Sequence, residues 1–213
     1  MRKYLIYIKI LFLSAIILSC EKELTTENIS RITYYPVFEV KGDRWAQIDK
    51  GGSWSDPGVI GKEGTKEISV KVEGADKVDL KTPGVYTIKY SAVNKDGYAA
   101  STYRYVGVID PVVKGKDISG NYKRTAGALG VSTVSKIKDN LFQANNVGGV
   151  EKPSDDVSVQ FYYYAPGKIK APYQFNGSGY FETKDEAIVE GEKYSWIVLN
   201  GGYGPALRTF VKQ

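Results

Sequence analysis

The fold is decided by the stretch Pro83-Gly84-Val85-Tyr86-Thr87-Ile88-Lys89-Tyr90-Ser91-Ala92, residues 83–92. From Tyr86 to Ala92 every second residue is apolar, and the residues between them are polar. Alternation with a period of two predicts a half-buried β-strand. The Pro-Gly pair before the strand and the segment Asn94–Gly97 after it are typical of turns. The sequence therefore predicts a strand of an antiparallel sheet, with Tyr86, Ile88, Tyr90 and Ala92 facing inward.

The segments on either side follow the same pattern. Residues 32–40 are rich in aromatic and β-branched residues, and residues 66–72 alternate, with Ile68, Val70 and Val72 on one face. Residues 101–109 form the last strand of this part, in which Tyr103 and Tyr105 face away from Val106 and Val108. No segment here has a convincing helical period. Short strands at this spacing predict a β-sandwich over residues 31–110.

Four motifs in this region resemble the bacterial surface immunoglobulin-like family, whose domains are found in repeats on cell-surface proteins and beside an insecticidal crystal toxin. They are Trp54-Ser55-Asp56-Pro57-Gly58-Val59, Pro83-Gly84-Val85-Tyr86, Tyr90-Ser91-Ala92 and Asn94–Gly97. The chain departs from the family pattern at Tyr98 and at Gly61-Lys62. The resemblance implies an Ig-like sandwich in which Tyr86 forms a tyrosine corner, its hydroxyl bonded to nearby backbone. Trp54 is expected to pack under its own Asp-Pro-Gly turn.

A second domain is predicted over residues 117–213, after a Pro- and Gly-containing linker at residues 111–116. About seven strands are expected, at 117–122, 131–138, 141–146, 157–164, 179–182, 194–199 and 206–211. This number favours a small antiparallel barrel or sandwich, so the fold class is all-β. The opening Ser119-Gly120-Asn121-Tyr122 resembles the first strand of lipocalin-like lipoproteins.

Residues 1–19 resemble a bacterial lipoprotein signal peptide. Arg2 and Lys3 give a basic start, an apolar run follows, and Ser19 precedes the single cysteine, Cys20. In such proteins the peptide is cut before the cysteine, whose thiol and new amine are acylated. The apolar run at 10–18 is shorter than the ~20 residues that a membrane span needs. The alternatives to a lipoprotein signal peptide are a plain signal peptide with a free thiol and a membrane anchor.

Residues 20–30 are expected to be a flexible acidic tether. The acids after Cys20 resemble the surface-export signal of lipoproteins from Bacteroidota, which implies an outer-membrane protein facing the cell exterior, with a periplasm-facing location as the alternative. Losing Arg2, Lys3 and Lys9 with residues 1–19 lowers the net charge from +5 to +2. This charge, without a dense basic cluster, argues against nucleic-acid binding.

The composition restricts the chemistry that the chain can perform. It contains no histidine and one cysteine, which excludes the usual Ser-His-Asp and Cys-His sites and histidine-ligated zinc. Acid pairs occur at Asp155-Asp156, Asp185-Glu186 and Glu190/Glu192, but they lie in predicted turns, where acids are common. We therefore expect no catalytic residue, no metal site and no cofactor.

Tyrosine is abundant, and the strand at 157–164 places two tyrosines on an otherwise polar face, with Ser158 and Gln160. Pyranose rings present flat C–H faces that pack on aromatic rings, and the tyrosine hydroxyl adds a polar tip. A sugar platform is one interpretation of this face; aromatics that fill a barrel or cover a domain interface are the other. The candidate ligand-binding residues are Tyr162, Tyr164, Tyr173, Trp196, Tyr203 and Trp45, and Tyr180 lies near them in the sequence.

The order of lipoprotein signal peptide, Ig-like domain and β-rich domain resembles that of small lipoproteins in Bacteroidota glycan-utilisation systems. It implies a surface-anchored, non-catalytic binding lipoprotein, held in the membrane through Cys20, that captures a glycan. One alternative is a structural subunit that docks on an outer-membrane transporter or another surface lipoprotein. An uncharacterised hydrolase is the other.

Overall fold

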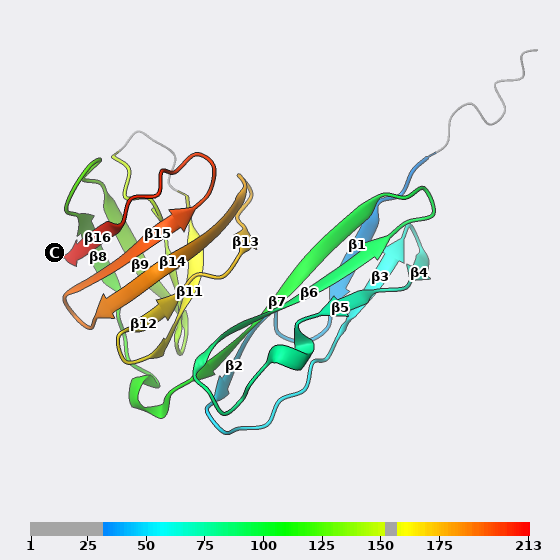
Figure 1. Ribbon diagram of the computed structural model, residues 1–213, viewed down its shortest axis with the longest axis horizontal. Coiled ribbons are helices and arrows are strands. Elements are labelled where there is room, and N and C mark those ends of the chain that lie inside the picture. The colour runs from blue at the N-terminus through cyan, green and yellow to red at the C-terminus, as the bar shows by residue number, and fades with distance from the viewer. Residues whose placement is uncertain (1–31, 152–156) are drawn as a thin grey trace, which may run out of the picture. The chain divides into compact units, whose positions relative to one another are not determined.

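The computed structural model describes residues 32–151 and 157–213, and residues 34–213 form one compact unit. The predicted signal peptide, Cys20 and the predicted tether at 20–30 lie outside the described residues. The described chain is all-β apart from two short 3₁₀ turns, which confirms the predicted fold class (Figure 1). None of its helical segments is long and apolar enough to cross a membrane. Because residues 34–213 hold all the described strands and their buried cores, we expect this unit to fold without the preceding residues.

The N-terminal sandwich, which we define as strands β1 to β7, contains two sheets. One sheet has the order β1 (Pro36–Val40), β3 (Val59–Glu63), β4 (Lys66–Ile68). The other has the order β2 (Trp45–Asp49), β7 (Ala99–Ile109), β6 (Gly84–Val93), β5 (Lys71–Glu73). Strand β2 runs parallel to β7, and the other pairs are antiparallel. The buried core between the sheets contains Ala46, Ile88, Tyr90 and Val106.

The prediction of one strand over residues 66–72 is wrong. The chain leaves the first sheet after β4 and enters the second at β5, so Val72 is 48% exposed and does not share a buried face with Ile68. At the crossing, the Val70 side chain packs against the core. A Cβ at Gly61 would lie 2.7 Å from Val70 Cγ2, so the absence of a side chain there makes room for the crossing.

Strand β6 follows its predicted alternation. Ile88, Tyr90 and Ala92 are buried, and the Tyr86 hydroxyl donates a hydrogen bond to the Thr82 carbonyl at 2.9 Å. This contact confirms the predicted tyrosine corner. Trp54 is half-buried and packs on the sandwich core.

Two 3₁₀ turns connect the strands. The first, η1 (Ala75–Lys77), follows β5. The second, η2 (Pro111–Val113), occupies the predicted linker, and the Asp110 carboxylate accepts a hydrogen bond from the Val112 amide at 2.9 Å. The Val113 side chain is fully buried, so it fixes this connection to the rest of the structure.

The C-terminal sheet, which we define as strands β8 to β16, has the order β12-β11-β10-β9-β8-β16-β15-β14-β13. It curls, because backbone bonds from Thr183 to the Ala171 carbonyl (3.0 Å) and from Ile188 to the Gly167 carbonyl (3.2 Å) join its two ends. The strands are β8 (Gly120–Arg124), β9 (Val131–Lys138), β10 (Leu141–Ala144), β11 (Val159–Ala165), β12 (Lys168–Lys170), β13 (Gln174–Phe175), β14 (Tyr180–Val189), β15 (Lys193–Leu199) and β16 (Arg208–Lys212).

Strands β12 and β13 were not predicted, and β14 extends well past the predicted end at residue 182. Asp185 has a positive φ of 54° inside β14, and the register with β15 shifts between Lys184 and Ala187. This bulge allows the polar segment to stay in the strand. Aromatic rings fill the interior of the curl, and the buried ones include Tyr122, Phe142, Phe161, Tyr194, Trp196 and Phe210.

Candidate functional site

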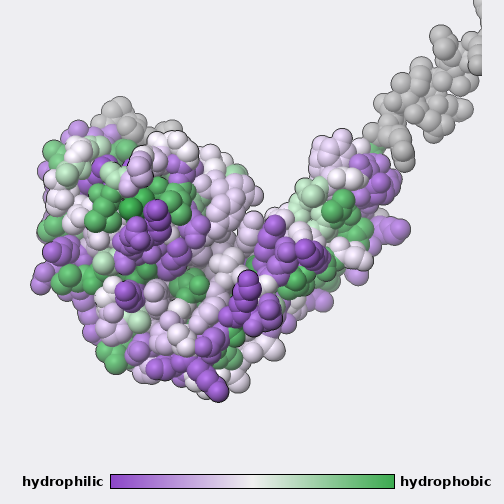
Figure 2. Space-filling model, in the orientation of Figure 1, coloured by the Kyte–Doolittle hydropathy of each residue, from purple (hydrophilic) through white to green (hydrophobic). Residues whose placement is uncertain are grey.

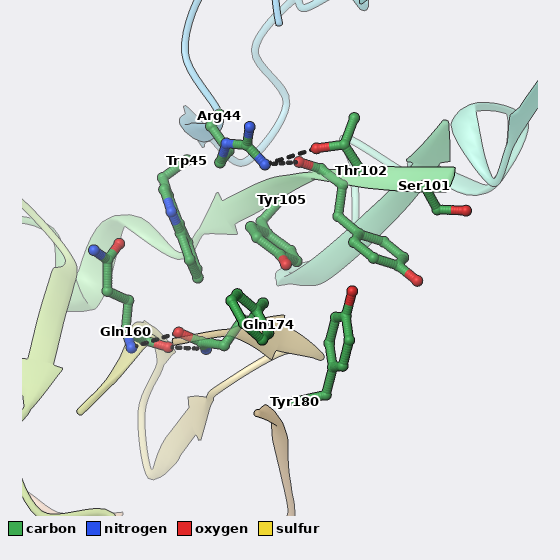
Figure 3. Close-up of a pocket in the computed structure, with 10 residues that line it drawn as sticks. Arg44, Trp45, Ser101, Thr102, Tyr105, Gln160, Gln174 and Tyr180 are labelled. Atoms are coloured by element: carbon green, nitrogen blue, oxygen red, sulfur yellow. Dashed lines mark hydrogen bonds between the residues drawn. The ribbon is translucent and has the colours of Figure 1, made fainter. Parts of the chain in front are cut away.

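A cleft of about 370 Å³ lies between strands β2 and β7 of the N-terminal sandwich and strands β11, β13 and β14 of the C-terminal sheet (Figure 3). We call it the aromatic cleft. Its volume is within the range of small-molecule sites, about 300–1,000 Å³. The residues that line it are Arg44, Trp45, Ser101, Thr102, Tyr103, Tyr105, Gln160, Gln174, Phe175 and Tyr180.

Strand alternation supplies the wall from the N-terminal sandwich. In β7, Arg104 and Val106 point into the sandwich, so Tyr103 and Tyr105 point out of its other face. Strand β2 pairs with β7 so that Trp45 lies beside Tyr105, and the two ring centres are 4.2 Å apart. Two neighbouring strands therefore place three aromatic rings on one surface.

The opposite wall carries an aromatic platform, made of Tyr173, Phe175 and Tyr180. Tyr173 and Tyr180 are stacked, with ring centres 4.8 Å apart and planes 5° apart, and Phe175 lies 5.2 Å from Tyr180. Tyr103 meets Tyr173 edge-on at 5.5 Å across the cleft. Tyr180 is 45% exposed and Phe175 is 61% exposed, so this platform is open to solvent.

Amide groups fix the floor of the aromatic cleft. The Gln174 side chain accepts a hydrogen bond from the Gln160 backbone N–H at 2.8 Å and donates one to the Gln160 carbonyl at 2.7 Å. The side-chain Oε1 of Gln160 is buried and has no hydrogen-bond partner among the described residues. Arg44 lies at the opposite edge, where its Nη1 donates to Thr102 Oγ1 at 2.9 Å and to the Tyr103 carbonyl at 3.2 Å.

The hydroxyls of Tyr103 and Tyr105 stay protonated at neutral pH. Burial raises the pKa of Tyr103, and the neighbouring hydroxyls of Tyr173 and Tyr180 raise it further. Burial also raises the pKa of Tyr105, whose hydroxyl donates a hydrogen bond to the Tyr173 carbonyl at 2.6 Å. This bond ties the two walls together. The cleft therefore combines apolar ring faces with neutral hydrogen-bonding groups.

The structure places the six predicted candidates in three different environments. Trp45 lines the aromatic cleft, and Tyr173 is part of its platform. Tyr164 is half-buried against the core of the C-terminal sheet, and burial raises its pKa. Tyr203 is also half-buried, with its ring 5.7 Å from Phe181 and 5.4 Å from the Arg208 guanidinium, and it does not line the cleft.

The expectation that Tyr162 lies on an open face is wrong. Its side chain is fully buried, with its ring against Gly107 of β7 and its hydroxyl 3.1 Å from the Ala46 carbonyl. Trp196 is also fully buried, and its Nε1 donates to the Val147 carbonyl at 2.8 Å. Tyr162 lies at the contact between the two β structures, and Trp196 fills the interior of the curled sheet. These are the two structural roles that the sequence offers as alternatives to a sugar platform.

Sequence reasoning missed Arg44, Tyr103, Tyr105 and Gln174 as cleft residues. The outward alternation of Tyr103 and Tyr105 was a usable signal, because two tyrosines on the outer face of a sandwich need either a partner or a ligand. Nothing in the sequence indicated that Gln174 would meet Gln160.

Two acids of the predicted pairs form ion pairs with lysines. Glu186 contacts Lys170 at 3.2 Å, and Glu190 contacts Lys116 at 2.6 Å; the hydrogen bond from Lys116 lowers the pKa of Glu190. Asp155 and Asp156 lie outside the described residues. Within the described ranges, no group of three or more acids or other ligating side chains could hold a metal ion.

Residues 38–108 match the family model described as bacterial surface protein, Ig-like domain, so this part of the chain is an Ig-like domain of the type that the motifs predicted. None of the curated proteins matches the chain. The crystal structure of a lipoprotein from Bacteroides thetaiotaomicron aligns with 84% of this chain and 100% of its own, at 21% identity and a TM-score of 0.36.

Proposed function

We propose that this protein is a non-catalytic surface lipoprotein that binds a glycan in the aromatic cleft. The observation that carries the proposal is the stacked pair of Tyr173 and Tyr180, which is partly open to solvent and has the Tyr103 ring in edge contact with Tyr173. The C–H faces of a pyranose can pack on such rings while hydroxyl and amide groups bind its oxygens. The Ig-like domain supplies one wall of the site, in addition to any role as a spacer.

The proposal includes an anchor at Cys20, with the protein facing the cell exterior. Replacing Cys20 with serine removes the thiol that would be acylated. We expect the Cys20→Ser protein to remain an uncleaved precursor without acyl chains. Fractionation of cells that express it checks this: a processed, membrane-bound Cys20→Ser protein would contradict the anchor.

Glycan binding is tested with residues 21–213 on a broad glycan panel. Replacing Tyr180 with alanine removes one ring of the stacked pair, so we expect affinity for the bound glycan to fall at least about tenfold, as for a central contact residue. Tyr103→Ala should weaken binding similarly. Titration calorimetry with the best panel member measures both effects.

Tyr98→Ala is the matched control. Tyr98 is a 48% exposed tyrosine that pairs with Tyr35 at 5.0 Å, and it does not line the aromatic cleft. Its removal should leave affinity unchanged. Equal losses in Tyr98→Ala and Tyr180→Ala would show that the cleft is not the site, and a silent panel would refute glycan binding and favour the docking subunit.

A broad apolar surface would support that docking role. On the face drawn in Figure 2, apolar residues form small groups interrupted by hydrophilic ones.

A further inference from the structure

Arg44 is the only charged residue among those that line the aromatic cleft, and the lining contains no carboxylate. Binding sites for neutral ligands can rely on hydroxyl and amide groups, of which this cleft has several. A guanidinium in such a site adds a planar set of N–H donors that match a carboxylate or a sulfate.

The Arg44 side chain is held in place by one of its nitrogens only. Nη1 donates to Thr102 Oγ1 and to the Tyr103 carbonyl, which are neutral acceptors on β7. Among the described residues, Arg44 forms no ion pair, and its Nε and Nη2 donate no hydrogen bond. The exposed guanidinium is therefore oriented by the protein without a carboxylate partner among the described residues, and its remaining donors are available to a ligand.

The nearest acid in the sequence does not neutralise Arg44. The Asp43 carboxylate accepts a hydrogen bond from the Trp45 amide at 3.0 Å through Oδ1, and its Oδ2 pairs with Lys138 of β9. Both carboxylate oxygens are thus engaged elsewhere. An anion that enters the cleft meets a positive charge with no competing carboxylate in the lining.

We propose that the aromatic cleft selects acidic saccharides, with Arg44 binding the carboxylate or sulfate while the sugar ring packs on Tyr180. This inference rests on the proposed function and specifies its ligand class. In Figure 3, Arg44 and Tyr180 lie on opposite sides of the space that the ligand would occupy. The anionic group and the sugar ring would therefore bind to different walls of the cleft.

The test uses residues 21–213 and a panel of matched pairs, in which each acidic oligosaccharide has a neutral counterpart. Uronic-acid oligomers are paired with their carboxyl-reduced forms, and sulfated oligomers with their desulfated forms. We expect the acidic member of the best pair to bind at least about tenfold more tightly, and added salt to weaken it, because the contact is electrostatic. The uronic-acid and sulfated pairs together show which anionic group is recognised.

Two variants separate charge from packing. Arg44→Gln should abolish the preference for the acidic member while leaving weak binding of both, whereas Arg44→Lys should keep part of the preference. Tyr180→Ala should weaken both members equally. Equal affinity for acidic and neutral members in the unmodified protein would overturn this inference and leave the proposed function intact. No binding to any matched pair would overturn this inference, and a silent broad panel would overturn the proposed function as well.

Discussion

Replacing Arg104 with methionine is expected to lower the free energy of unfolding by about 3–5 kcal/mol, as when one partner of a buried ion pair is removed. The Arg104 side chain is fully buried inside the N-terminal sandwich. Its charge is nevertheless compensated by hydrogen bonds and an ion pair. Its partners are the Asp56 carboxylate at 3.1 Å, the Tyr90 hydroxyl at 3.1 Å, and the carbonyl oxygens of Gly58, Lys41 and Asp43. Methionine fills similar space but leaves these acceptors unpaired in the interior.

Urea denaturation of residues 21–213 measures the effect. Lys71→Met is the control, because the Lys71–Glu73 ion pair is exposed and its loss should leave the stability almost unchanged. Combining Arg104→Met with Asp56→Asn should cost less than the sum of the two single changes, since both break the same contact. A loss below about 1 kcal/mol in Arg104→Met would show that the buried network contributes little to stability.

This network explains why the Asp-Pro-Gly turn marks the fold. Asp56 Oδ1 accepts hydrogen bonds from the Gly58 amide at 3.0 Å and from the Tyr90 hydroxyl at 2.6 Å, so it fixes the turn and joins it to β6. Burial raises the pKa of Tyr90 to about 12, and its hydrogen bond to Asp56 also favours the protonated hydroxyl. Two of the motifs can be recognised in the sequence because they contain local contacts with strict geometry: the Gly58 amide with Asp56, and the Tyr86 hydroxyl with the Thr82 carbonyl.

Alternation predicted β6 well because Ile88, Tyr90 and Ala92 lie on one face of that strand and are buried. The same rule failed at residues 66–72, since a chain that crosses from one sheet to the other keeps its alternation while its surroundings change. The short strands β12 and β13 carry too few residues for any period. Their place is set by the closure of the curled sheet, which is a long-range effect.

The aromatic cleft could be predicted only in part. Trp45 and Tyr173 are predicted because they are aromatic, but the two walls come from segments far apart in the sequence, such as Trp45 and Gln160. Tyr162 was selected for lying on a polar face of its strand. That face is polar along its length, yet at Tyr162 it meets another domain, and no pattern within one strand can reveal a contact with a second sheet.

Replacing Tyr162 with alanine is expected to destabilise the fold by about 3–5 kcal/mol, the usual cost of removing a buried aromatic side chain. The buried cluster that contains Tyr162 also holds Tyr105 and Ile109 of β7, so the N-terminal sandwich and the C-terminal sheet share a core. A Cβ on Gly107 would lie only 2.7 Å from two carbon atoms of the Tyr162 ring, so the ring needs a glycine at this position.

Two further variants test the hydroxyl of Tyr162 and the space that its ring occupies. Tyr162→Phe should cost only about 1 kcal/mol, because it removes the hydrogen bond to the Ala46 carbonyl and keeps the packing. Gly107→Val should destabilise strongly from the opposite side, since its side chain would displace the Tyr162 ring. Urea denaturation followed by tryptophan fluorescence measures all three changes. If Tyr162→Ala were as stable as the unmodified protein, the shared core would not hold the two β structures together, and the walls of the aromatic cleft would need another source of rigidity.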